Sequence, residues 1–175
     1  MRIKKKIKGT EVIDLLRRLQ DINLRGVKLT YNISRNKELL SSAYKHFEEA
    51  EKPDPKYMEF TKKADDVKFK HAKKDEDGKP ITTKIPRKDQ QPIVQVHIDG
   101  VDDPKSPFNI EIEALKKEYN DAIKQRENEG KEYEELLNKN FEFEFHPLNI
   151  DWFPDDVDQF AMDTLSIWLT DEAEK

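Results

Sequence analysis

The sequence predicts an α+β fold that is predominantly helical, with a helical hairpin, further helices and a small β-sheet. Apolar residues recur at three- and four-residue spacing over most of the chain, strict alternation is confined to short runs, and five of the nine prolines fall between residues 75 and 107. With 175 residues, of which 35% are hydrophobic and 39% charged, the chain suits one domain with a thin core. We expect a single domain over residues 1–175, in which residues 75–107 form an inserted turn and β-arm.

The N-terminal part is expected to hold a strand and a helical hairpin. Residues 2–8 alternate apolar and basic side chains, which is typical of an edge strand, and Thr10 is suited to cap the helix that follows. That helix is expected to stop near Gly26. The next helix carries an apolar stripe at helical spacing: Leu29, Ile33, Leu40 and Phe47. Asp54 and Pro55 suit the first turn of a third helix that continues to about residue 72.

The proline-rich middle is expected to contain one strand. Val94, Val96 and Ile98 alternate with polar residues, and this pattern predicts a half-buried strand over residues 93–99. A flexible linker is the alternative, but linkers seldom alternate so regularly.

The C-terminal part is expected to hold a long helix, a strand and a last helix. Ser106 caps the long helix, the longest of the chain, whose apolar stripe continues to Leu137. Three phenylalanines on one face mark the cleanest strand: Phe141, Phe143 and Phe145. We expect the helical hairpin and the last helix, residues 157–169, to cover that face.

Charges are sorted along the chain. Residues 1–98 contain 24 Lys/Arg and 15 Asp/Glu, whereas residues 99–175 contain 8 and 22. Such an asymmetry concerns partners and assembly, because the field of a surface steers association, and it specifies neither a fold nor a reaction. The alternative is that the sorting reflects solvated helix faces.

Several classes of protein are excluded by composition. The chain has no cysteine, so disulfides, thiolate nucleophiles and cysteine zinc sites are absent. No run approaches the roughly 20 apolar residues that span a bilayer, and the basic start is not followed by the apolar run of a signal peptide. We therefore expect a soluble, unexported protein without a membrane partner.

No arrangement of residues indicates catalysis. The four histidines lie in four different segments without metal-ligand spacing, and there is no glycine-rich phosphate cradle or nucleophile elbow. The prediction is no enzyme activity, no cofactor and no metal.

Nucleic-acid binding is the main rival to a protein partner. A candidate basic contact face lies on the third helix and just after it: Lys62, Lys63, Lys70 and Lys73. No base-reading motif accompanies these lysines, and the acidic C-terminal half would repel a polyanion.

Exposed aromatic residues could anchor a protein partner. Trp152 and Phe153 are the candidates, since they lie beside a proline in an expected loop, and core packing is the alternative for both. Trp168 lies on the stripe of the last helix, where we expect core packing.

The order of elements and several short phrases carry a resemblance over the whole chain. The phrases are VKLTYNISRNKELL (27–40), KDEDGKP (74–80), EYEELLNKN (132–140) and FEFEFHPLNID (141–151). In these the chain resembles a family of small, uncharacterised proteins encoded by tailed phages and prophages, relative to which residues 81–107 look like an insertion. The resemblance implies a phage setting and a small α+β fold, and it implies no activity and no catalytic residues.

The favoured hypothesis is a non-enzymatic phage protein that acts through protein–protein contacts, most simply as a minor virion or assembly component. Its partner would be a phage structural protein or further copies of itself, in the virion or the host cytoplasm, and the sorted charges would allow head-to-tail docking. One alternative is an early phage factor that binds and inhibits or redirects a host defence protein. Another is a non-specific nucleic-acid-binding protein that uses the basic N-terminal half.

Overall fold

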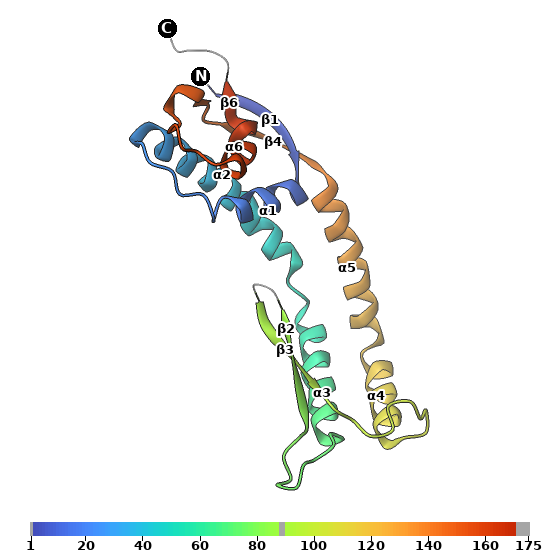
Figure 1. Ribbon diagram of the computed structural model, residues 1–175. Helices are drawn as coiled ribbons and strands as arrows, with labels where there is room; N and C mark the ends of the chain where they lie inside the picture. Colours follow the sequence, from blue (N-terminus) through green and yellow to red (C-terminus); the bar gives the residue numbers. More distant parts are fainter. Residues whose placement is uncertain (1, 88–89, 171–175) are drawn as a thin grey trace. The chain divides into compact units, whose positions relative to one another are not determined.

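The computed structural model describes residues 2–87 and 90–170 (Figure 1). The α-helices are α1 (Gly9–Arg18), α2 (Val27–Glu51), α3 (Pro55–Lys70), α4 (Pro107–Glu118), α5 (Asn120–Asn138) and α6 (Gln159–Leu165). The strands are β1 (Ile3–Lys8), β2 (Thr82–Arg87), β3 (Gln90–Val96), β4 (Asn140–Phe145), β5 (Leu148–Asn149) and β6 (Leu169–Thr170). They form the two-stranded sheets β1–β4, β2–β3 and β5–β6. The predicted α+β, predominantly helical fold is confirmed.

The chain divides into two compact units. The discontinuous unit comprises residues 1–52 and 129–175, and the inserted unit comprises residues 53–128. The segment 75–107, expected to be an insertion into one domain, therefore lies inside a unit that begins more than twenty residues earlier.

In the discontinuous unit, β1 and β4 pair antiparallel, with Ile3 opposite Phe145 and Ile7 opposite Phe141. This register turns the phenylalanines of β4 to one face, as their alternation predicts. Phe145 is fully buried against Trp168, with 5.5 Å between ring centroids, and Phe141 packs against Phe47 of α2. The three phenylalanines are thus covered by α2 and the C-terminal segment, which confirms the expected packing of Trp168.

The first helix differs from its prediction. It begins at Gly9 rather than after a Thr10 cap, and the Glu11 carboxylate accepts the N–H of Lys8 at 2.7 Å. It also ends at Arg18, well before Gly26. Gly26, with φ of 118°, immediately precedes α2, so it marks the start of the second helix rather than the end of the first.

In the inserted unit, α3 and α4 pack through a small core of Ala64, Val67 and Leu115. Two predicted caps are confirmed: Asp54 accepts the N–H of Lys56 at 2.8 Å, and Ser106 accepts the N–H of Asn109 at 3.2 Å. Each cap is followed by a proline at the first helical position.

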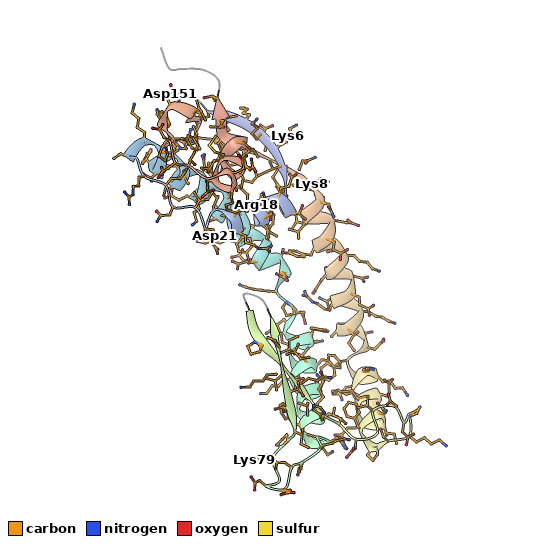
Figure 2. All side chains as sticks on the ribbon, in the orientation of Figure 1. Lys6, Lys8, Arg18, Asp21, Lys79 and Asp151 are labelled. Carbon is orange, nitrogen blue, oxygen red and sulfur yellow. The ribbon has the colours of Figure 1, made fainter. Side chains whose placement is uncertain are left out.

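The connection between α3 and β2 contains a tight turn at residues 75–79. The Asp75 side chain accepts the N–H groups of Asp77 and Lys79 at 3.0 and 2.8 Å, and Gly78 has φ of 78°. Figure 2 labels Lys79 on the loop between α3 and β2. The turn leads into a β-hairpin in which Thr82 pairs with Val96 and Ile85 with Ile93.

The other element boundaries were predicted less well. β3 covers Gln90–Val96 instead of 93–99, and its partner β2 was not predicted. The helix expected to continue to Leu137 is broken at Tyr119 into α4 and α5, so that α2, with 25 residues, is longer than either. The last helix is α6 followed by a 3₁₀ turn, Ser166–Trp168.

Within the described residues, no helix combines the length and the apolar character needed to cross a membrane.

Candidate protein-contact surface

The inserted unit has an apolar groove of about 540 Å³. It is lined by α3, the hairpin, the turn after the hairpin and the start of α4. Its described lining residues are Asp65, Lys68, Phe69, Ile85, Ile93, Val94, Gln95, Val96, Ile98, Val101 and Phe108. We call this surface the hairpin groove.

Large apolar side chains in the hairpin groove are half exposed. Phe69 is 47% exposed, Val94 48% and Val101 50%. Ile85 and Ile93 are 41% and 40% exposed. On α3, Ala64 and Val67 occupy the face that packs on α4, so Phe69, two residues after Val67, falls on a different side of the helix. A cluster of this kind on a small unit is unusual for a surface that meets only water.

The hairpin groove is almost neutral. Of its described lining residues only Asp65 and Lys68 are charged, and their side chains pair with one another at 2.7 Å. The stretch from Gln90 to Ile98 contains no Asp, Glu, Lys or Arg. An uncharged apolar surface of this kind favours contact with another apolar surface over contact with a polyanion or a charged small molecule.

Polar side chains beside the groove connect α3 to α4. Glu111 accepts from Lys70 at 2.7 Å and lies 2.8 Å from Nε2 of His71. Hydrogen bonds from Lys70 and His71 lower the pKa of Glu111 from its usual value. The His71 ring also lies edge-on to Phe108 of the groove. These contacts hold the two helices that form one wall of the groove.

A second polar cluster also connects α3 to the end of α4. The hydroxyl of Tyr119 donates to Glu59 at 2.7 Å and accepts from Lys63 at 2.5 Å, and Lys63 also pairs with Glu118. The hydrogen bonds to Tyr119 and Glu59 raise the pKa of Lys63, which keeps it charged. Both clusters are ion-pair networks between helices, and among the described residues no group of three His, Asp or Glu side chains is placed to hold a metal ion.

Most of the predicted basic face is already paired within the inserted unit. Lys63 contacts Glu59 at 3.1 Å, Lys70 contacts Glu111, and Lys73 contacts Asp99 at 2.7 Å. Lys62 is exposed. Each paired lysine would have to leave a carboxylate before it could neutralise a phosphate, so the electrostatic gain from a nucleic acid is reduced.

The predicted interface aromatics lie in the discontinuous unit and are half-buried. Trp152 and Phe153 pack against its core, and the ammonium of Lys28 lies 5.7 Å from the Trp152 ring centroid. The structure therefore gives both side chains contacts within the discontinuous unit, whereas the hairpin groove is formed by residues of the inserted unit.

The sorted charges of the chain are brought together by the fold. Lys4 of β1 pairs with Glu144 and Glu142 of β4 at 3.2 and 3.9 Å, and Lys6 and Lys8 lie on the same strand (Figure 2). The discontinuous unit contains 16 Lys/Arg and 21 Asp/Glu, and the inserted unit contains 16 of each. The asymmetry along the sequence is thus largely compensated within the discontinuous unit, and the charge argument for head-to-tail docking is weakened.

The hairpin groove was not predicted from the sequence. One available signal was the uncharged run from Gln90 to Ile98 in a chain of which 39% is charged, since an uncharged run with β-branched residues is typical of a surface that contacts protein. Nothing in the sequence indicated that Phe69 and Val101 would lie beside that run.

The comparisons with known proteins add no relative. No family model matches the chain, and neither the curated proteins nor the solved structures gave a match.

Proposed function

We propose that this protein acts by binding another protein through the hairpin groove, as a non-enzymatic phage protein that serves as a minor virion or assembly component. The observation that carries the proposal is the half-exposed apolar lining of the groove, together with its lack of net charge. The phage setting rests on the resemblance in element order and short phrases.

The groove offers enough apolar surface to matter for affinity. Full burial of a Val, Ile or Phe side chain is worth about 1.5–3 kcal/mol, so covering a half-exposed one contributes on the order of 1 kcal/mol. Five such side chains line the groove: Phe69, Ile85, Ile93, Val94 and Val101. Together they form the kind of central apolar patch on which binding energy concentrates in protein interfaces.

An early phage factor that engages a host defence protein would use the same surface, so the identity of the captured protein separates these two versions. Nucleic-acid binding would instead use the lysines of α3, and the ion pairs of Lys63, Lys70 and Lys73 count against it.

The test is capture of partners by the tagged full chain from infected cells, in parallel with the double variant Phe69→Gln/Val101→Ser. Val27→Ser is the matched control, because Val27 is 88% exposed and lies in the discontinuous unit, outside the groove. We expect a phage structural protein to be captured by the wild type and the control and to be lost with the double variant.

High salt and nuclease are applied to each capture. Apolar contact survives both treatments, whereas phosphate contacts weaken steeply with salt. If the double variant captures the same protein as the wild type, the groove is refuted as the contact surface. If nucleic acid alone is recovered and is lost in high salt, a protein partner is refuted.

A further inference from the structure

We propose that the hairpin groove binds a second copy of this chain, with the two copies paired antiparallel along the free edge of β3. The inference rests on the proposed function, since it names the partner and the mode of contact at the same surface.

The backbone groups of β3 alternate in direction along the strand. In an antiparallel pair, alternate residues face the neighbouring strand with their N–H and C=O groups. His97 donates its N–H to the carbonyl of Ile81 at 3.0 Å, and the register continues through Thr83 opposite Gln95 and Ile85 opposite Ile93. From Ile93 to His97 the odd-numbered residues therefore face β2, whereas the register shifts between Ile85 and Arg87, where Arg87 pairs with Gln90.

Val94 and Val96 consequently direct their backbone groups away from β2. In the described part of the chain, the sheet of β2 and β3 has two strands, so the outer edge of β3 has no strand beside it. Val94 and Val96 each offer an N–H and a C=O at this edge. An isolated two-stranded hairpin is marginally stable in water, and a further strand would stabilise it.

The charges of the strands decide which partner fits the edge of β3. An edge strand with an uncharged apolar lining accepts a strand that is itself uncharged, because a charge brought there would lose water without gaining a partner. Among the described strands of six or seven residues, β1 carries four lysines, β2 carries Lys84 and Arg87, and β4 carries two glutamates. β3 is uncharged throughout, so the strand that best satisfies its own edge is β3 of another copy.

The backbone directions also fix the register of the two copies of β3. A two-fold axis through Gln95 places Val94 opposite Val96 of the second copy and Gln95 opposite its own equivalent. Val94 and Val96 both direct their backbone groups outward, so this register forms two hydrogen-bonded pairs, with four bonds in total. The two Gln95 residues then form the non-hydrogen-bonded pair, in which opposite Cα atoms are about 4.5 Å apart.

The apolar side chains of β3 and of the groove fit this pairing. Val94, Val96 and Ile98 share a face of β3, and Val96 and Ile98 are already half-buried while Val94 is 48% exposed. A second copy at the edge would bring its own valines over Val94 and the adjoining groove residues Phe69 and Val101. A four-stranded sheet with one apolar face covered by helices is a common and stable arrangement.

The experiment is sedimentation equilibrium of the full chain over a range of concentrations, with two variants that test the register, one that tests the edge of β3 and one control. Gln95→Glu and Gln95→Lys each place like charges opposite one another at the two-fold axis, which is destabilising for cross-strand pairs. Gln95 is exposed, so neither change disturbs the hairpin core. Thr82→Glu is the matched control, since Thr82 is exposed on β2, away from the paired edge.

We expect the wild type to shift from the 20.7 kDa monomer to a dimer with rising concentration. Each Gln95 variant weakens the dimer by at least about threefold, an equimolar mixture of the two restores it, and Thr82→Glu leaves it unchanged. Val94→Pro, which removes an outward N–H and none that faces β2, abolishes the dimer. A wild type that stays monomeric, a dimer indifferent to Val94→Pro, or a mixture that does not recover would each overturn the β3 pairing.

Failure of this inference is distinguishable from failure of the proposed function. A monomeric chain that still captures a phage protein through Phe69 and Val101 would refute self-pairing and support the proposed function. A chain that dimerises through β3 but captures no other protein would support self-pairing and refute a role in binding a different phage or host protein.

Discussion

Asn36 of α2 pairs through its side-chain amide with the backbone of His146. Its Nδ2 donates to the His146 carbonyl at 2.8 Å and its Oδ1 accepts the His146 N–H at 2.7 Å. Asn36 is fully buried, and the paired residue directly follows β4. The amide thus takes the place of a neighbouring strand at the end of β4 and fixes that end to α2.

Replacing Asn36 should destabilise the discontinuous unit strongly. Asn36→Leu has a similar volume but leaves the N–H and C=O of half-buried His146 without their partners, at about 1–3 kcal/mol for each group. We expect a loss of roughly 2–4 kcal/mol in the free energy of unfolding, measured by urea denaturation.

Asn32→Leu is the control for that measurement. Asn32 is on the same helix and is only half-buried, so the same substitution should change stability by less than about 1 kcal/mol. Equal effects of the two substitutions would show that the pairing with His146 is not what stabilises this end of β4.

Asn36 also illustrates what the sequence could and could not predict. The apolar stripe of α2 was found from its spacing, and the caps at Asp54 and Ser106 were found from local chemistry, because both signals lie within a few residues. A buried asparagine on that stripe is satisfied by a residue 110 positions away, which no local pattern indicates.

The hairpin groove was missed for a similar reason. β2 contains Lys84 and Pro86 and lacks a clean alternation, so only its pairing with β3 identifies it as a strand. The groove itself depends on tertiary contacts that place Phe69 and Val101 beside the hairpin. The uncharged composition of β3 was visible, but its exposure was not.

Two glycines should respond in opposite directions to alanine. A Cβ at Gly9 would lie 2.9 Å from the backbone Cα of Leu137, so β1 and α1 would have to move away from α5. We expect Gly9→Ala to destabilise the protein by about 1–3 kcal/mol. A Cβ at Gly130, inside α5, would meet nothing within 4 Å, and alanine there should stabilise the helix by about 0.5–1 kcal/mol.

The melting temperatures of the two single variants and the wild type, measured by thermal unfolding, check both predicted changes in stability. Gly130→Ala serves as the matched control, since it is the same substitution without the close approach. A melting temperature that rises for both variants would contradict the tight contact between Gly9 and Leu137.

The stability of the inserted unit should depend on pH through Glu111. Its pKa in the folded protein is lowered by hydrogen bonds from Lys70 and His71, so the ionised form is favoured by folding. The stabilisation is therefore fully present above the pKa of an unfolded glutamate and is lost as the pH falls through the lower, folded value. Glu111→Gln removes this contribution at neutral pH and should change little in acid.

Urea midpoints of the wild type and Glu111→Gln, compared at pH 7 and at about pH 3, measure this dependence. We expect the difference between them to shrink in acid. Glu132→Gln, at an exposed position on α5, serves as the control for a general loss of charge. A difference that stays constant, or grows, as the pH falls would mean that Glu111 is not held in its ionised form by Lys70 and His71.

The alternating direction of backbone groups in β3 should be visible in amide hydrogen exchange of the dilute protein. Ile93 and Gln95 direct their N–H groups toward β2 and should exchange slowly relative to Val94 and Val96, whose N–H groups point away from it. Burial predicts a different order, because Ile93 and Gln95 are exposed while Val96 is half-buried. Slow exchange at Val96 with fast exchange at Gln95 in dilute solution would therefore contradict the hydrogen-bond alternation, and with it the edge on which the β3 pairing depends.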